Sequence, residues 1–95
     1  MRVRGEPLGA LRAEVERVDA ELVRLLAERA ALARRIGAAK RALGRPTLDP
    51  PREAAVVRRA AELARAAGVA DEEGVRGIFW QLVAMARRAQ DGGPG

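Results

Sequence analysis

Four polar residues lie where the helical pattern of the sequence otherwise places apolar side chains. Arg29 and Lys40 fall on the apolar face of a long first segment, about 20° apart around a helix with 3.6 residues per turn. Glu53 stands one turn before the apolar face of the next segment, and Gln90 ends that of the last segment. Because a buried charge needs an opposite charge or a ligand, Glu53 can neutralise one of the two cations. The remaining positive charge, in a cavity lined by Leu, Val and Ala, favours a pocket for a small dicarboxylate, which arginine binds through forked hydrogen bonds.

Two further cations lie at the margins of these faces, Arg12 near the start of the chain and Arg52 beside Glu53. Lys40 is the single lysine among eighteen basic residues, which favours a chemical requirement for lysine at this position. Each polar residue also has a structural interpretation. An arginine can extend to solvent from a helix face, Gln90 can be exposed at a helix end, and Glu53 can serve the dipole of its helix. The residues alone therefore predict an anion pocket in a helical protein and no more.

The composition excludes several kinds of chemistry. The chain of 95 residues contains neither cysteine nor histidine, which removes thiolate and imidazole metal ligands and the commonest general base. We therefore expect no metal and no cofactor, and chemistry carried by Arg, Lys, Asp, Glu, Gln and backbone groups. No apolar run approaches the roughly 20 residues of a membrane span, and no signal peptide is apparent. We expect a cytoplasmic protein with no membrane partner.

The net charge of +5 raises the question of nucleic-acid binding. The basic residues are interleaved with Glu and Asp instead of forming a block, as on a solvated helix surface. One Trp, one Phe and no Tyr provide no aromatic platform on which bases could stack. We expect no nucleic-acid partner.

A long helix over about residues 7–43 must carry the two central cations. Its apolar residues recur at alternating steps of three and four, the seam of a helix that packs lengthwise on other helices. Gly37 is expected to permit the close approach of a neighbouring backbone or ligand, and the segment 44–46 (Gly-Arg-Pro) ends the helix. The seam consists of Leu8, Leu11, Val15, Val18, Leu22, Leu25, Leu32, Ile36 and Leu43.

Two shorter helices follow. Asp49 as N-cap and the two prolines after it start a helix over about residues 50–67, with Gly68 as its C-cap glycine. A third helix spans about residues 71–90, and residues 91–95 are expected to form a disordered tail. The sequence thus predicts an all-α fold with three helices in a single domain over residues 1–95.

The lengths of these helices predict an assembly. The first helix is about 54 Å long, and the other two are roughly half that, so they cannot cover its whole seam. Its N-terminal apolar half, Leu8 to Leu25, therefore needs a partner, most economically a second copy of the chain. We predict an intertwined helical homodimer.

From Leu8 to Gln90, the chain resembles the all-helical, AroQ-type chorismate mutases. The resemblance rests on several motifs in order: Leu-Arg at 11–12 with Asp19 seven residues after the arginine, L-L-x-E-R at 25–29, I-G-x-x-K at 36–40, D-x-x-R-E at 49–53, and a closing Gln on the last helix. The family rearranges chorismate to prephenate by a [3,3] sigmatropic shift, in the route to phenylalanine and tyrosine. Its members are helical dimers with two equivalent sites, each completed by an arginine from the other protomer.

The resemblance implies a role for each polar residue. Lys40 resembles the lysine that bridges a substrate carboxylate and the ether oxygen of the breaking bond, and Gln90 resembles the second donor to that oxygen. The carboxylates would be held by Arg29 of the same chain and Arg12 of the partner chain. Glu53 resembles the acceptor of the ring hydroxyl. Asp49 and Arg52 would shape the same corner of the site.

One position departs from the family pattern. Many members carry a Ser that contacts a substrate carboxylate four residues before the closing Gln, where this chain has Ala86. The change removes one hydrogen bond, about 1 kcal/mol or somewhat more to a charged group. It leaves open an isochorismate pyruvate lyase or a 4-amino-4-deoxychorismate mutase on the same scaffold. A non-catalytic basic helical module that binds a regulatory partner or nucleic acid is a further alternative. No segment resembles a regulatory domain, although a separate enzyme could bind the surface.

Overall fold

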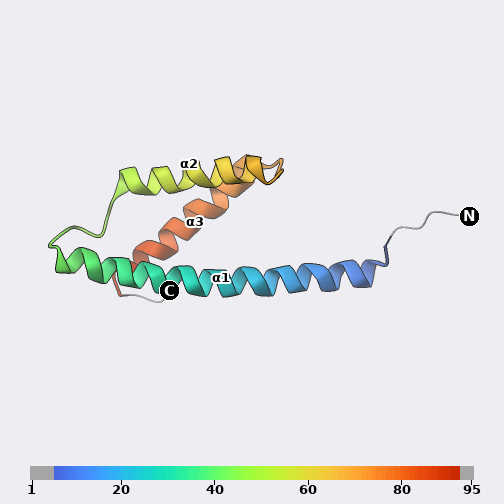
Figure 1. Cartoon of the computed structure of the whole chain (residues 1–95), viewed down its shortest axis with the longest axis horizontal. Helices are drawn as coiled ribbons and strands as arrows, with labels where there is room; N and C mark the ends of the chain where they lie inside the picture. Colours follow the sequence, from blue (N-terminus) through green and yellow to red (C-terminus); the bar gives the residue numbers. More distant parts are fainter. Residues whose placement is uncertain (1–5, 93–95) are drawn as a thin grey trace, which may run out of the picture.

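The computed structural model describes residues 6–92. It contains three α-helices, α1 (Leu8–Ala42), α2 (Pro50–Ala66) and α3 (Glu72–Gln90), and no strand in this part of the chain (Figure 1). The prediction of an all-α fold with one long and two short helices is confirmed. Residues 91–92 form a turn after α3, and the rest of the predicted tail lies outside the described residues. No helix within residues 6–92 is long and apolar enough to cross a membrane.

The first helix, α1, runs without interruption for 35 residues. It ends at Ala42, and Gly44 follows with a φ of +66°, a left-handed conformation that a residue with a side chain rarely adopts. The Gly44 amide donates to the carbonyl of Arg41 (3.1 Å), and the Arg45 amide donates to that of Lys40 (2.8 Å). These two bonds satisfy carbonyls that the helix itself leaves without donors, so glycine stops the helix at the residue predicted.

The ends of α2 and α3 follow the same local chemistry. The Asp49 carboxylate accepts a hydrogen bond from the amide of Arg52 (3.2 Å), and the Asp71 carboxylate accepts one from the amide of Gly74 (2.8 Å). Each therefore caps the N-terminus of its helix, where backbone amides have no partner within the helix. Gly68, with a φ of +79°, follows the last turn of α2 as the predicted C-cap glycine.

The third helix joins the other two. α3 packs against α1 and against α2, whereas no Cα atom of α1 lies within 8 Å of one of α2 in the described chain. Figure 1 shows α3 crossing obliquely between α1 and α2. Small side chains permit this close packing. The buried apolar residues are Ala33, Val57, Ala60, Ala61, Ala64, Val83 and Ala89.

The apolar seam of α1 is not the surface on which α3 packs. The two buried residues of α1 are Ala33 and Gly37, and the seam residues next to them, Leu32 and Ile36, remain 46% and 49% exposed. The short helices therefore leave this part of the seam partly uncovered in the single chain. Close packing selects the small residues, which lie about 100° around the helix from the large ones. The N-terminal end of α1, blue in Figure 1, extends beyond the other two helices.

Candidate active site

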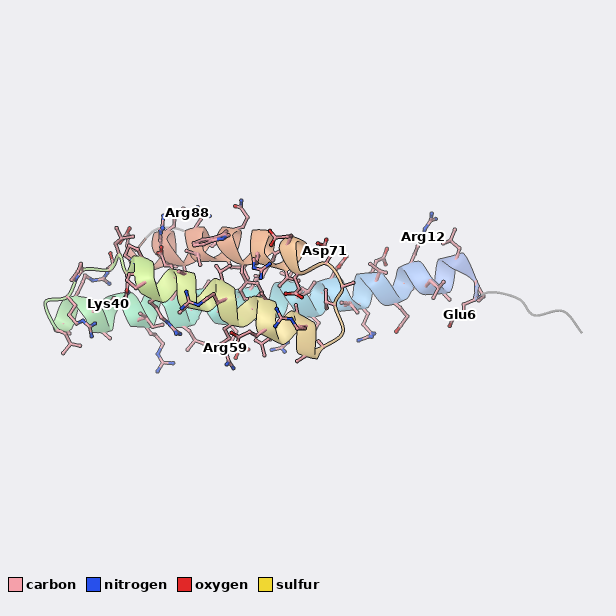
Figure 2. The ribbon with its side chains drawn as sticks, turned by 90° about the horizontal axis from the view of Figure 1, so that it is seen from above. Glu6, Arg12, Lys40, Arg59, Asp71 and Arg88 are labelled. Atoms are coloured by element: carbon pink, nitrogen blue, oxygen red, sulfur yellow. The ribbon has the colours of Figure 1, made fainter. Side chains whose placement is uncertain are left out.

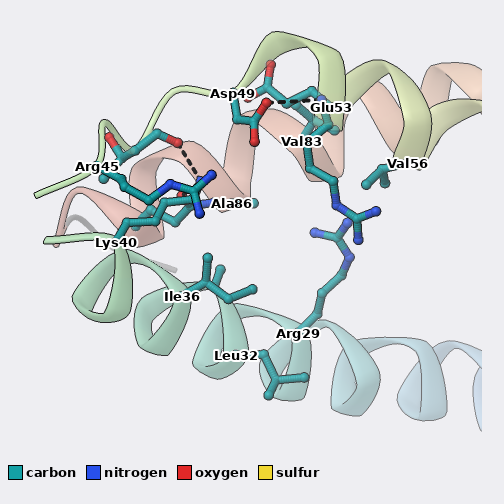
Figure 3. Close-up of a pocket in the computed structure, with 14 residues that line it drawn as sticks. Arg29, Leu32, Ile36, Lys40, Arg45, Asp49, Glu53, Val56, Val83 and Ala86 are labelled. Atoms are coloured by element: carbon teal, nitrogen blue, oxygen red, sulfur yellow. Dashed lines mark hydrogen bonds between the residues drawn. The ribbon is translucent and has the colours of Figure 1, made fainter. Parts of the chain in front are cut away.

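A cavity of about 480 Å³ lies between the C-terminal half of α1, the start of α2, the last turns of α3 and the α1–α2 loop (Figure 3). This volume is within the roughly 300–1,000 Å³ typical of small-molecule sites. Its lining combines apolar side chains from α1, α2 and α3 with a cluster of polar and charged groups. The lining residues are Arg29, Leu32, Ala33, Ile36, Lys40, Arg45, Thr47, Asp49, Arg52, Glu53, Val56, Val83, Ala86 and Gln90.

Arg29 and Lys40 rise from α1 into this cavity, as their spacing predicted (Figure 3). The Arg29 guanidinium donates a long hydrogen bond to the carbonyl of Leu82 (3.4 Å). Burial lowers the pKa of Arg29, and the nearby positive charge of Arg52 lowers it further. Within residues 6–92, neither arginine forms an ion pair with a carboxylate. Two guanidinium groups that face one cavity and form no ion pair within the described residues are suited to an anionic ligand.

Lys40 and Gln90, fifty residues apart in the sequence, meet at the other end of the cavity. The Lys40 ammonium donates to Oε1 of Gln90 (2.9 Å) and to the backbone carbonyl of Thr47 (2.7 Å). An ammonium has three donors, so one remains for a ligand. Because Oε1 of Gln90 accepts from Lys40, the amide nitrogen is the end of Gln90 that remains to donate. The pair thus presents two donors to one region of the cavity.

The backbone of Gln90 is held against α1. A Cβ atom added to Gly37 would lie 2.3 Å from the carbonyl oxygen of Gln90, a distance that no side chain could occupy. The expected close approach at Gly37 is therefore confirmed, with the neighbouring backbone being that of Gln90. The Arg41 guanidinium donates to the same carbonyl (2.6 Å). In addition, the Thr47 hydroxyl donates to the carboxylate of Asp91 (2.9 Å). These contacts fix the last turn of α3, and with it the position of the Gln90 amide.

The ion pair expected for Glu53 is different in the structure. The sequence suggested that Glu53 neutralises one of the cavity cations, whereas its two oxygens accept hydrogen bonds from Arg87 of α3 (Nε to Oε2, 2.7 Å; Nη2 to Oε1). This pairing lowers the pKa of Glu53, and burial opposes the shift. Sequence reasoning missed Arg87 because several arginines precede Gln90 and their pairing depends on how α2 and α3 cross. The cavity therefore keeps the positive charge of both α1 cations.

The remaining predicted residues divide into two groups. Asp49, Arg52 and Ala86 all line the cavity, where Ala86 offers only a methyl group. Arg12 does not, because 28 residues at 1.5 Å each place it about 42 Å along α1 from Lys40. Figure 2 shows these two residues toward opposite ends of the helix.

Two polar lining residues, Arg45 and Thr47, were not identified as site residues from the sequence. They belong to the α1–α2 loop, where no periodic pattern indicates the direction of a side chain. The predicted helix stop at 44–46 was the one available signal, since it implies that the chain turns back toward the cavity at this point.

Comparisons with known proteins agree with this arrangement. The family described as chorismate mutase type II matches residues 11–91. The chain is 36% identical over 80 residues to a bifunctional chorismate mutase/prephenate dehydratase of Aquifex aeolicus, a match that spans 82% of the chain but only 22% of that longer protein. It is also 32% identical over 78 residues to a chorismate mutase of Methanocaldococcus jannaschii, spanning 82% of the chain and 78% of that protein.

The family match includes nearly all of the three helices and every residue that lines the cavity. The relative of comparable length is similar over most of both chains. On this evidence, and with residues of the motifs at 25–29, 36–40 and 49–53 and the closing Gln90 gathered at one cavity, the chain belongs to the type II, AroQ-type chorismate mutase family.

Proposed function

We propose that the chain is a chorismate mutase, which converts chorismate to prephenate by an intramolecular [3,3] sigmatropic shift. The observation that carries the proposal is the convergence of Lys40 Nζ and Gln90 Oε1, 2.9 Å apart, at a cavity that is also lined by Arg29 and Arg52, whose guanidinium groups form no ion pair within residues 6–92. Chorismate is a dicarboxylate with an ether bond that breaks, so it needs both cations and donors near one oxygen. Such a site supplies both.

The proposed mechanism needs no nucleophile and no general base. Cations hold the two carboxylates so that the enolpyruvyl arm folds over the ring, with the carbons that will bond close together. As the C–O bond breaks, negative charge grows on the ether oxygen, and Lys40 and Gln90 donate to it. Removing one such preorganised donor typically costs about 10²–10³-fold in rate, or about 3–4 kcal/mol.

Other lining residues orient the ring in this scheme. Glu53 accepts the hydrogen bond of the ring hydroxyl, and Asp49 and Arg52 shape the same corner of the cavity. Ala86 contacts the substrate only through its methyl group. Its effect is tested by offering chorismate, isochorismate and 4-amino-4-deoxychorismate to the same preparation and comparing kcat/KM.

We further propose that two copies of the chain form an intertwined dimer. The six seam residues from Leu8 to Leu25 are 41–60% exposed in the single chain. They follow one face of a helix that extends beyond its own fold, a larger apolar stripe than monomers usually expose. In this assembly Arg12 of the partner subunit reaches the cavity and supplies a second carboxylate clamp. Sedimentation that shows a stable monomer at micromolar concentration would reject the dimer.

The direct test of the function is to incubate the purified protein with chorismate and follow both substrate loss and the appearance of prephenate. Lack of turnover by a folded protein would reject the proposal and leave a non-catalytic helical module as the alternative.

A complementation experiment tests the shared site separately. Arg12→Ala and Lys40→Ala chains, each inactive alone, should regain activity when mixed, because one of the two sites in the mixed dimer then has both residues. No recovery despite demonstrated subunit exchange would reject the role of Arg12 in the partner subunit's site.

A further inference from the structure

Glu53, which lines the cavity, forms an ion pair with Arg87, a residue that belongs to none of the sequence motifs. Arg87 of α3 donates to both carboxylate oxygens of Glu53 on α2, through Nε to Oε2 (2.7 Å) and Nη2 to Oε1. Glu53 lines the cavity, whereas Arg87 does not. The Glu53 side chain is 14% exposed and that of Arg87 is 50% exposed. Arg87 therefore holds a cavity carboxylate from the solvent side.

This geometry restricts the orientation of the Glu53 carboxylate but leaves it able to accept further hydrogen bonds. A guanidinium fork that engages both oxygens fixes the plane of the carboxylate as well as its position. An ionised carboxylate has about four acceptor sites, so each oxygen can still accept a bond from a ligand. The ion pair also joins the first turn of α2 to the last turns of α3, the helix that carries Gln90.

Two other charged groups of the described chain act on Glu53, and neither holds its carboxylate as Arg87 does. The Lys40 ammonium attracts Glu53 but donates to Thr47 and Gln90 instead. Asp49, at the N-cap of α2, repels it. Arg87 is thus the cation that both neutralises and orients this carboxylate in the described chain.

We propose that Arg87 is a positioning residue of the active site, which holds the ionised Glu53 carboxylate in the orientation that accepts the substrate's hydroxyl. This inference rests on the proposed function, in which Glu53 contacts the ring hydroxyl of chorismate.

The consequence is a pH dependence with a defined sign. The hydrogen bonds from Arg87 are the largest cause that lowers the pKa of Glu53, ahead of the attraction of Lys40, while burial and Asp49 raise it. Without Arg87 the pKa of Glu53 rises, so more of the carboxyl group is protonated at a given acidic pH. On acidification, a variant without Arg87 should therefore lose activity at a higher pH than the wild type does. Its activity should return as the pH is raised.

The test compares Arg87→Gln, Arg87→Lys and Arg88→Gln. Arg88 is the neighbouring exposed arginine and does not line the cavity, so its variant is the matched control for charge. We expect Arg87→Gln to lower kcat/KM for chorismate by about tenfold at pH 5, the size of a lost hydrogen bond to a charged group. The loss of kcat/KM in Arg87→Gln should be smaller at pH 8. At each pH, Arg87→Lys should lie between the wild type and Arg87→Gln, and Arg88→Gln should behave like the wild type. An unchanged acid limb in Arg87→Gln, or a loss that is the same at every pH, would overturn the inference.

A second measurement requires no turnover. The titration of the Glu53 carboxyl group is followed by ¹³C NMR, with its resonance assigned from a Glu53→Gln variant, in the wild type and in Arg87→Gln. A midpoint that moves to higher pH supports the inference, and an unmoved midpoint overturns it. A wild type that titrates as expected but does not turn over chorismate would instead reject the proposed function.

Discussion

Replacing Gly37 with alanine should displace the side-chain amide of Gln90, the proposed donor to the ether oxygen, because the added methyl group would clash with the backbone of Gln90. The added Cβ would lie 2.3 Å from the carbonyl oxygen and 2.7 Å from Cα of Gln90. Neither atom belongs to a flexible side chain, so the end of α3 must move away from α1. Reaching an ordinary contact of 3.4 Å from 2.3 Å requires a displacement of about 1 Å.

That displacement has two consequences of different size. Overpacking costs about 1–3 kcal/mol, and the helix propensity of alanine returns up to about 1 kcal/mol, so the net loss of stability is about 0–3 kcal/mol. The hydrogen bond of 2.9 Å between Lys40 and Gln90 would lengthen to about 4 Å, beyond hydrogen-bonding distance. A misplacement of about 1 Å can cost about 10²-fold in rate, so kcat should fall by about 100-fold while the helices remain.

Gly77→Ala is the matched control, because Gly77 lies within α3 and a Cβ there meets no atom within 4 Å. This variant should gain up to about 1 kcal/mol from helix propensity and keep its activity. Urea unfolding at one protein concentration and steady-state kinetics with chorismate measure both effects. A Gly37→Ala protein as stable and as active as Gly77→Ala would refute the reasoning.

Three further predictions concern the donors, a cap and an ion pair. Lys40→Ala and Gln90→Ala should each lower kcat at least about 100-fold with an unchanged circular dichroism spectrum, and near-normal rates would mean that the donors are misassigned. Asp71→Ala should reduce the free energy of unfolding by about 1 kcal/mol, whereas Asp71→Asn, which keeps an acceptor for the α3 amide, should lose less; equal losses would argue against the cap. The hydrogen bonds from Arg65 lower the pKa of Glu72 below its ordinary 4.5, so this pair stabilises the fold above pH 4.5, and the contribution is lost as the pH falls through the lowered value. Urea titrations across this range should show a smaller acid loss in Glu72→Gln than in the wild type.

Much of the site follows from local rules. Eleven residues make nearly whole turns of a helix, so Arg29 and Lys40 had to share a face wherever that face pointed. Asp49 and Gly68 mark helix ends because unpaired backbone groups and left-handed φ angles favour these residues anywhere. Gly37 in a helix interior indicated close contact, since a glycine there otherwise only weakens the helix. These conclusions need the sequence and the geometry of one helix.

The partners of these residues depend on how the helices cross, which periodicity does not specify. Leu63 and Ile78 are large apolar residues, yet they are more than half exposed, because α3 approaches its neighbours through small residues. Glu53 pairs with Arg87 and not with a cavity cation, since that arginine is the one that the α2–α3 crossing brings to it.

The sequence by itself thus determined three helices, their ends and a shared face for two cations, because hydrogen bonding along the chain and 3.6-residue periodicity act locally. Only the tertiary structure decided that Lys40 meets Gln90 and that Glu53 meets Arg87. Each of these contacts joins helices distant in sequence, so the docking of their surfaces determines which side chains come within reach.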